Sequence, residues 1–74
     1  MSKVRENNEF DVRVGSNIKE LREKQNMTQQ EIADKLNVSR AAVCHWETGE
    51  RALYFYIAKD LCKVLNCSLE DLLK

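Results

Sequence analysis

The stretch of sequence that decides the fold is Thr28–Gly49, which reads TQQEIADKLNVSRAAVCHWETG. It contains two short patterns typical of helices. Each pattern begins at a hydroxyl residue, Thr28 or Ser39, whose side-chain oxygen can accept a hydrogen bond from a free backbone N–H group. Almost nothing separates the two patterns, and two helices joined by so short a turn cross at a steep angle.

The first pattern predicts a helix over residues 29–36. Thr28 and Glu31 have the spacing of a capping box, in which each side chain bonds the backbone of the other residue. Asn37 follows this helix and Gly49 follows the second, and both residue types tolerate the left-handed backbone that often ends a helix. The apolar face expected of the first helix consists of Ile32, Ala33 and Leu36.

The second pattern predicts a helix over residues 40–47. Val43 and Trp46 stand three residues apart and therefore share its inner face. An ordinary helical hairpin in a small bundle would also show caps and amphipathic helices. Against this alternative, the turn is too short for side-by-side helices, and the second helix presents solvated donors at Arg40 and His45. Both features favour a helix that enters a DNA groove while another braces it.

The rest of the chain predicts three more helices, so the expected fold class is all-α with five helices. Residues 1–11 are polar and have no apolar period, so they are expected to form a flexible arm before a single domain at residues 12–74. The additional helices are expected at Val12 or Ser16 to Gln25, with inner residues Val14, Ile18 and Leu21, at Tyr54 to Asn66, and at Leu69 to Leu73 after a Ser68 cap.

Composition limits the classes of function. No stretch is long or apolar enough to cross a membrane, and no signal peptide is recognisable, so a cytoplasmic location is expected. The net charge is zero, whereas most DNA-binding domains carry a basic surplus. Between Leu36 and Trp46, however, the only charged side chain is Arg40. This segment is locally positive, and a weakly binding single domain would depend on dimerisation for useful affinity.

The three cysteines are not expected to form disulfides, because their number is odd and the expected compartment is reducing. Their spacing fits no zinc pattern, and no metal or cofactor is predicted. Cys62 and Cys67 are interpreted as small core residues, and Cys44 is the one candidate for redox sensing. With a single His and no phosphate loop or catalytic triad that can be placed, the sequence does not favour an enzyme.

These features together resemble a Cro and phage-repressor (xenobiotic-response-element) type helix-turn-helix domain. The resemblance extends from about Val12 to Lys74, nearly the whole chain. It implies a five-helix lambda-repressor-like fold with the helix-turn-helix at the second and third helices. The matching residues are Ile18, Leu21, Arg22, Met27–Ala33, Leu36, Val38, Ser39, Val43, Trp46, Glu47, Gly49, Ala58, Leu61, Leu65 and Ser68–Leu73.

The resemblance also implies a structural ion pair between Arg22 of the first helix and Glu47 at the end of the third. Such a pair would tie the reading helix to the scaffold. The alternative is a solvated surface pair, which contributes about 0–1 kcal/mol. The matching positions of both residues favour the structural pair.

The residues expected to read DNA bases are Arg40, Ala41 and His45, since side chains near the start of the second motif helix face base edges in the major groove. Arg40 suits guanine, whose O6 and N7 accept two donors, and Ala41 suits a thymine methyl group. His45, four residues after Ala41, can donate to guanine N7 or to a phosphate. The alternative is that Arg40 and His45 are ordinary solvated side chains.

A second set of residues is expected to contact the DNA backbone without reading its sequence. Thr28, Gln29 and Ser39 lie at helix N-termini, where free N–H groups favour anions. Thr48 and Arg51 match the loop that touches the DNA backbone in similar domains.

The chain departs from the family pattern just before the fourth helix, where similar proteins often have a Pro and a Ser-type cap. Leu53 and Tyr54 stand there instead, and Phe55 matches a core position. Tyr54, Tyr56 and Ile57 are larger and more apolar than an exposed helix end needs. They could extend the core, contact phosphates, or form a subunit interface. The predicted homodimer interface comprises Tyr54, Ile57, Val64 and Leu69.

Two functions are consistent with this sequence. One is a sequence-specific transcriptional repressor or activator that binds an operator in double-stranded DNA as a homodimer, like phage repressors and the small controller proteins of restriction-modification systems. The other is an antitoxin or accessory subunit that uses the same fold to bind a partner protein as well as DNA. Tight co-purification with a second protein would favour the second function.

Overall fold

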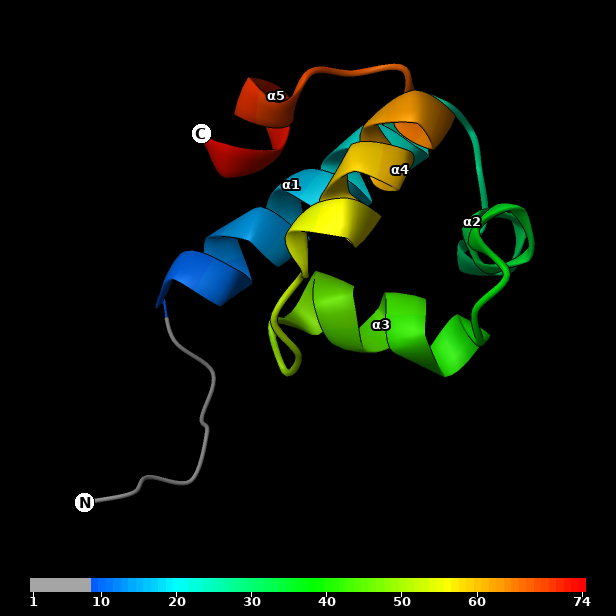
Figure 1. Ribbon diagram of the computed structural model, residues 1–74, viewed down its shortest axis with the longest axis horizontal. Helices are drawn as coiled ribbons and strands as arrows, with labels where there is room; N and C mark the ends of the chain where they lie inside the picture. The colour runs from blue at the N-terminus through cyan, green and yellow to red at the C-terminus, as the bar shows by residue number, and fades with distance from the viewer. Residues whose placement is uncertain (1–8) are drawn as a thin grey trace.

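The computed structural model describes residues 9–74 and contains five helices in that range (Figure 1). They are α1 (Glu9–Lys24), α2 (Gln29–Leu36), α3 (Arg40–Thr48), α4 (Phe55–Leu65) and α5 (Leu69–Leu73). Residues 9–74 contain no strand, so the all-α prediction is confirmed for this part of the chain. None of the helices described is both long and apolar enough to span a membrane.

The helix boundaries agree with the prediction to within about a residue, except at the start of α1. This helix begins at Glu9 rather than at Val12 or Ser16, so residues 9–11 belong to it and not to an arm. Glu9 and Asp11 lie in its first turn, where carboxylates interact favourably with the helix dipole. The remainder of the predicted arm, residues 1–8, lies outside the described residues.

Three helix ends have the same backbone structure. An asparagine adopts the left-handed conformation at each of them, with φ values of 58° at Asn26, 59° at Asn37 and 54° at Asn66. The next residue then donates its N–H to a carbonyl in the last turn of the helix, which is the Schellman arrangement. These bonds join Met27 N to Arg22 O (3.1 Å), Val38 N to Ala33 O (2.9 Å) and Cys67 N to Cys62 O (2.9 Å).

Side-chain caps begin α2, α3 and α5. Thr28 and Glu31 form the predicted capping box, since Thr28 Oγ1 accepts from Glu31 N at 3.0 Å and Glu31 Oε1 accepts from Thr28 N at 2.8 Å. Ser68 forms a second capping box with Asp71. α4 begins after Tyr54 without a side-chain cap, consistent with the missing Ser-type residue at this point.

All five helices contribute to one core. α1 and α3 approach closely at Gly15, where an added Cβ atom would lie 2.5 Å from the carbonyl oxygen of Glu47 and closer still to that of Trp46. These are backbone atoms that cannot rotate away, so no larger residue fits. The buried core residues are Val14, Ile18, Ile32, Ala33, Ala42, Val43, Trp46, Ala58, Leu61, Leu65 and Leu72.

Of the two aromatic residues expected in the core, one is buried and the other is exposed. Trp46 is 4% exposed, which confirms its assignment to the inner face of α3. Phe55 is 66% exposed, so the expectation of a core position was wrong. Phe55 is the first residue of α4, ahead of the buried stripe that starts at Ala58, and Leu53 of the preceding loop packs against the core instead.

Candidate nucleic-acid interface

The helix-turn-helix consists of α2 and α3, which are joined by residues 37–39. Figure 1 shows α2 nearly end-on and α3 lying across the lower edge of the molecule, so the two helices cross steeply. α3 packs against both α1 and α2. Its buried side carries Ala42, Val43, Trp46 and Glu47. Its other side forms an edge of the molecule.

The predicted base-reading residues lie on this outer side of α3. Arg40 and Ala41 are exposed in its first turn. His45 is half-buried, with 40% of its side chain exposed, and follows Ala41 by one helical turn. We call the surface formed by Arg40, Ala41 and His45 the reading end.

Arg22 and Glu47 form the predicted ion pair. Arg22 Nε donates to Glu47 Oε2 at 2.6 Å and Arg22 Nη2 donates to Glu47 Oε1 at 3.1 Å, so the contact is bidentate. The two side chains are only 12% and 4% exposed, which excludes the alternative of a solvated pair. The hydrogen bond to Glu47 raises the pKa of the Arg22 guanidinium. Arg22 Nη1 also donates to Met27 O at 2.8 Å, so one side chain ties α1 to α3 and to the turn before α2.

Gln29 has a role that the sequence analysis missed. Its side chain is not free for DNA, because Gln29 Nε2 donates to Glu47 Oε1 at 2.9 Å and Gln29 Oε1 accepts from Arg40 Nη1 at 3.3 Å. The carboxamide thereby connects the buried ion pair to the reading end. These residues are distant in sequence and on different helices, so no local pattern could have indicated the contact.

Three of the residues predicted to contact the DNA backbone, Thr28, Ser39 and Thr48, are already engaged in local hydrogen bonds. Thr28 and Ser39 are exposed, and their hydroxyls accept backbone N–H groups as helix caps. After α3, Thr48 Oγ1 lies 3.2 Å from the carbonyl oxygen of His45 and 3.1 Å from Glu50 Oε1. Glu50 Oε1 also lies 3.8 Å from His45 Nε2. This exposed carboxylate beside Thr48 opposes close approach of a phosphate there.

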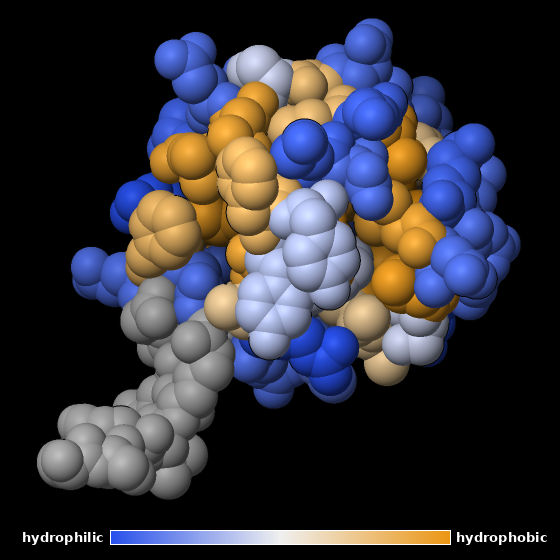
Figure 2. Space-filling view, viewed as in Figure 1, coloured by the Kyte–Doolittle hydropathy of each residue, from blue (hydrophilic) through white to orange (hydrophobic). Residues whose placement is uncertain are grey.

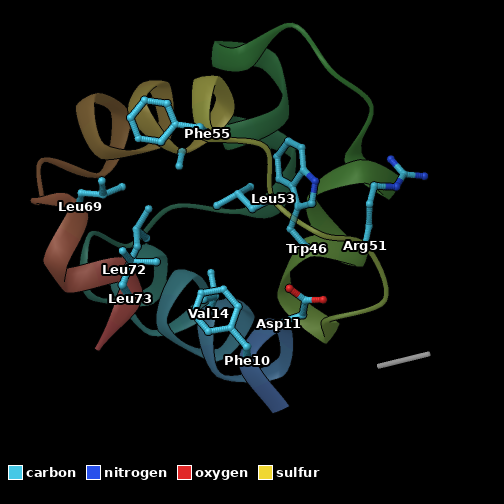
Figure 3. Close-up of a pocket in the computed structure, with 11 residues that line it drawn as sticks. Phe10, Asp11, Val14, Trp46, Arg51, Leu53, Phe55, Leu69, Leu72 and Leu73 are labelled. Atoms are coloured by element: carbon cyan, nitrogen blue, oxygen red, sulfur yellow. The ribbon is translucent and has the colours of Figure 1, made fainter. Parts of the chain in front are cut away.

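A pocket of about 220 Å³ opens at another part of the molecule (Figure 3). Its lining comes from the start of α1, the end of α3, the loop before α4, the start of α4, and α5. Figure 3 shows Leu53 and Leu72 directed into the pocket and Phe10 and Phe55 on opposite sides of it. The guanidinium of Arg51, an exposed residue, is directed away from the pocket.

Large apolar side chains are exposed near this pocket. Figure 2 shows apolar residues gathered on the left of the view, over α5 and the start of α1. The rings of Tyr54 and Tyr56 stack with 5.9 Å between their centroids. We call this surface the aromatic end; its residues are Phe10 (51% exposed), Tyr54 (63%), Phe55 (66%), Tyr56 (66%) and Leu73 (44%).

The predicted interface residues coincide only in part with the aromatic end. Tyr54 is exposed, but Ile57, Val64 and Leu69 are half-buried and pack against the core. Each of these three side chains still has part of its surface exposed, so their place in a dimer interface stays a prediction. Their apolar side chains also contribute to the core of this small domain. Phe10 was not among the predicted interface residues, because residues 1–11 were expected to form an arm.

Cys62 and Cys67 are half-buried and pack against the core, as predicted. They occupy the two positions of a Schellman motif whose side chains ordinarily touch. Burial, with a contribution from Cys62, raises the pKa of the Cys67 thiol to about 11, so it stays protonated at neutral pH. Cys44 is half-buried on α3. Within residues 9–74 no three His, Cys, Asp or Glu side chains are grouped so that they could hold a metal ion.

Solved structures include proteins with the same arrangement of helices. The restriction-modification controller protein C.AhdI from Aeromonas hydrophila superposes with a TM-score of 0.78 and 24% identity, over 82% of this chain and 92% of that one. The clp gene regulator ClgR from Corynebacterium glutamicum gives a TM-score of 0.84 and 20% identity, over 92% and 72%. At these identities the likeness establishes the fold, which is the lambda-repressor-like helix-turn-helix fold.

Sequence comparison then identifies the family. A Helix-turn-helix family model matches residues 18–72. The HTH-type transcriptional regulator YqaE of Bacillus subtilis (strain 168) is 36% identical over 58 residues, 78% of this chain and 50% of that protein. An HTH-type transcriptional regulator of Archaeoglobus fulgidus is 36% identical over 55 residues, 74% and 78% of the two chains. The chain belongs to the Cro/C1-type helix-turn-helix family of DNA-binding transcriptional regulators. It spans half the length of the Bacillus relative.

Proposed function

We propose that this chain is a sequence-specific transcriptional regulator that inserts α3 into the major groove of an operator. The observation that carries the proposal is the division of α3 into two faces. Its inner face is buried in the core, whereas Arg40 and Ala41 are exposed at its start. A helix held in this way can approach base edges without disturbing the fold. The lack of acids between Leu36 and Trp46 keeps the surface compatible with DNA phosphates.

The proposed roles follow from the donors and acceptors of each side chain. Arg40 would contact guanine O6 and N7, Ala41 a thymine methyl group, and His45 guanine N7 or a phosphate. Backbone contacts would position the domain without reading sequence. They are proposed for Thr28, Gln29, Ser39, Thr48 and Arg51. Gln29 would act through its backbone N–H group because its carboxamide is engaged within the protein. The contact at Thr48 would be weakened by the neighbouring Glu50 carboxylate.

We further propose that the chain binds DNA as a homodimer formed through the aromatic end. A chain with zero net charge gains useful affinity by joining two reading heads. The exposed rings around a pocket supply both projecting and recessed apolar shapes, as a two-fold interface requires. Such an axis would place the two copies of α3 about 34 Å apart, one turn of DNA.

A second candidate is an accessory subunit or antitoxin that binds a partner protein through the aromatic end. The same observation supports it, because exposed aromatic residues beside a pocket suit protein partners in general. Purification from the native host distinguishes the two proposals. A second protein that remains bound through sedimentation at micromolar concentration would favour the accessory subunit.

Selection of bound sites from a random pool of duplexes tests the primary proposal. We expect a two-fold symmetric site, with half-sites about one helical turn apart. Arg40→Ala should weaken binding to the best site by about 1–3 kcal/mol and remove the preference at one base pair of each half-site. If both Arg40→Ala and His45→Ala leave affinity and preference unchanged, α3 does not read the operator.

A further inference from the structure

Two thiols, those of Cys62 and Cys67, meet at the end of α4. Cys67 N donates to Cys62 O at 2.9 Å, and Asn66 before it has the left-handed backbone, with a φ of 54°. In this Schellman arrangement the side chains of the two bonded residues ordinarily touch. Both cysteines are half-buried and pack against the core. The end of the helix therefore brings the two thiols together.

The same motif at the end of α2 shows what these positions hold elsewhere in the molecule. There Val38 N donates to Ala33 O at 2.9 Å. Ala33 is buried and Val38 packs against the core, so the pair is apolar. Such a pair supplies the hydrophobic contact of the motif. At the end of α4 the contact is made by two groups that can also form a covalent bond.

The geometry of the motif suits a disulfide. A disulfide joins residues whose Cα atoms lie about 4.4–6.8 Å apart and whose side chains converge. The backbone hydrogen bond of 2.9 Å holds the main chains of Cys62 and Cys67 close to each other. Burial raises the pKa of the Cys67 thiol to about 11, and the charge of Cys62 and a hydrogen bond with it raise the pKa further towards that value. The last two effects require the sulfur atoms to be neighbours.

We propose that Cys62 and Cys67 form a reversible disulfide site whose oxidant is a low-molecular-weight disulfide. The Cys62 thiolate attacks one sulfur of the small disulfide, which gives a mixed disulfide and releases one small thiol. The Cys67 sulfur then gives up its proton and attacks Cys62 Sγ, so that the protein disulfide forms and the second small thiol leaves. Two protein thiols are oxidised, their protons pass to the released thiols, and one small disulfide is reduced.

The order of the two steps follows from the environment of Cys67. Its raised pKa keeps this thiol protonated at neutral pH, and the thiolate is the attacking form. Cys62 therefore makes the first attack. Once Cys62 carries the mixed disulfide, Cys67 is already beside it, and this proximity favours the second step over attack by a free thiol.

The disulfide would tie the last turn of α4 to the segment that begins α5. α5 is short, its Leu72 is fully buried, and Leu69 and Leu73 also line the pocket. A cross-link at its start would limit local opening of this helix. Disulfides in reducing compartments are usually transient and redox-sensing. The site would thus make the stability of the α4–α5 junction respond to the thiol redox state. This inference is independent of the proposed function, because neither cysteine lies in α2 or α3.

The test equilibrates the full chain with glutathione and a rising proportion of glutathione disulfide, once folded and once unfolded in urea. Free thiols are then alkylated, and the products are identified by mass spectrometry. Trypsin cleaves after Lys63, so a disulfide between Cys62 and Cys67 holds two peptides together. The fraction of the chain that carries this link is measured at each proportion.

We expect the folded chain to be half cross-linked at about one-tenth of the proportion of glutathione disulfide that the unfolded chain requires, because the motif holds the sulfur atoms together. Linkage then requires the oxidised protein to resist urea better than the reduced protein, and a reducing agent should reverse this gain. Equal proportions in the two states, or glutathione on both cysteines without a cross-link, would overturn the inference.

The third cysteine provides a matched control. Cys44 is also half-buried but lies on α3, outside the motif, so Cys44→Ser should leave the cross-linking unchanged. Cys62→Ser and Cys67→Ser should each carry glutathione on the remaining cysteine of the pair and form no cross-link. A disulfide from Cys44 to either cysteine of the wild-type chain would contradict the assignment. The comparison of folded and unfolded states uses the wild type, so it is decisive even if a variant does not fold.

Discussion

The reading end and the aromatic end of this molecule are organised by different interactions. At the reading end, polar side chains are connected by hydrogen bonds of 2.6 to 3.3 Å that run back to a buried ion pair. At the aromatic end, large rings are exposed around a pocket of about 220 Å³. Hydrogen bonds impose direction, whereas apolar area does not. Sequence recognition and association should therefore respond to different substitutions.

The largest expected effect comes from replacing Trp46, on the buried side of the helix that carries the reading end, and Phe55 of the aromatic end is its exposed counterpart. Trp46→Ala should destabilise the domain by about 3–5 kcal/mol, because Trp46 is 4% exposed and α3 packs through it. Phe55→Ala should change the free energy of unfolding of the monomer by about 0.5 kcal/mol or less, since Phe55 is 66% exposed. Urea denaturation measures both. A Trp46→Ala protein as stable as the wild type would mean that the register of α3 is wrong.

A smaller loss of stability is expected when the buried Glu47 is replaced, and the exposed Glu50 provides the comparison. Glu47→Gln should cost about 3 kcal/mol, because it leaves the Arg22 guanidinium, 12% exposed, without its carboxylate. Glu50→Gln should have little effect on stability, since the Glu50 side chain is 57% exposed. Thermal melting of the two variants side by side separates the contributions. Similar melting temperatures would indicate that water stabilises the Arg22 guanidinium as well as the Glu47 carboxylate does.

At the aromatic end, the expected change is in assembly and not in folding. Phe55→Glu places a charge on the exposed face and should give a folded monomer with much weaker operator binding. Ile57 and Val64 are poorer positions for this test, because both pack against the core. Sedimentation at micromolar concentration reports the oligomeric state. A wild-type monomer that binds a single half-site with full affinity would rule out the dimer.

The smallest expected effect is a pH dependence at Cys67, just after α4. The pKa of its thiol is raised to about 11 by burial, from an ordinary value of 9.0, so folding favours the protonated form. The stability that this proton contributes is complete below pH 9 and is lost as pH rises towards 11. Melting temperature measured across this interval should fall less steeply for Cys67→Ala. An unchanged slope in the variant would assign the loss to another group.

The parts of this structure that sequence predicts are those determined by neighbouring residues. The caps at Thr28 and Ser39 and the left-handed Asn37 each depend on a few adjacent positions. The burial of Trp46 follows from the spacing of one helix face. The ion pair of Arg22 with Glu47 was available through the family resemblance alone, because the two residues are far apart in sequence.

The remaining features depend on how the helices pack together. Phe55 is exposed whereas Leu53, in the loop before α4, packs against the core, and the spacing of α4 does not reveal this. α1 begins at Glu9, inside a polar segment whose sequence by itself shows no helical period. The bridging of Gln29 requires that the ends of α1, α2 and α3 meet. Such three-helix contacts leave no periodic signal in the sequence.

The close approach of α1 and α3 at Gly15 has a mechanical consequence for recognition. Because the two backbones meet without an intervening side chain, α3 has little freedom to tilt or slide relative to α1. A protein that cannot adjust the angle of its reading helix leaves that adjustment to the DNA. We expect operators to be ranked partly by how easily they bend or twist, even at base pairs that no side chain touches. Flexible pyrimidine–purine steps at the centre of the site should then favour binding.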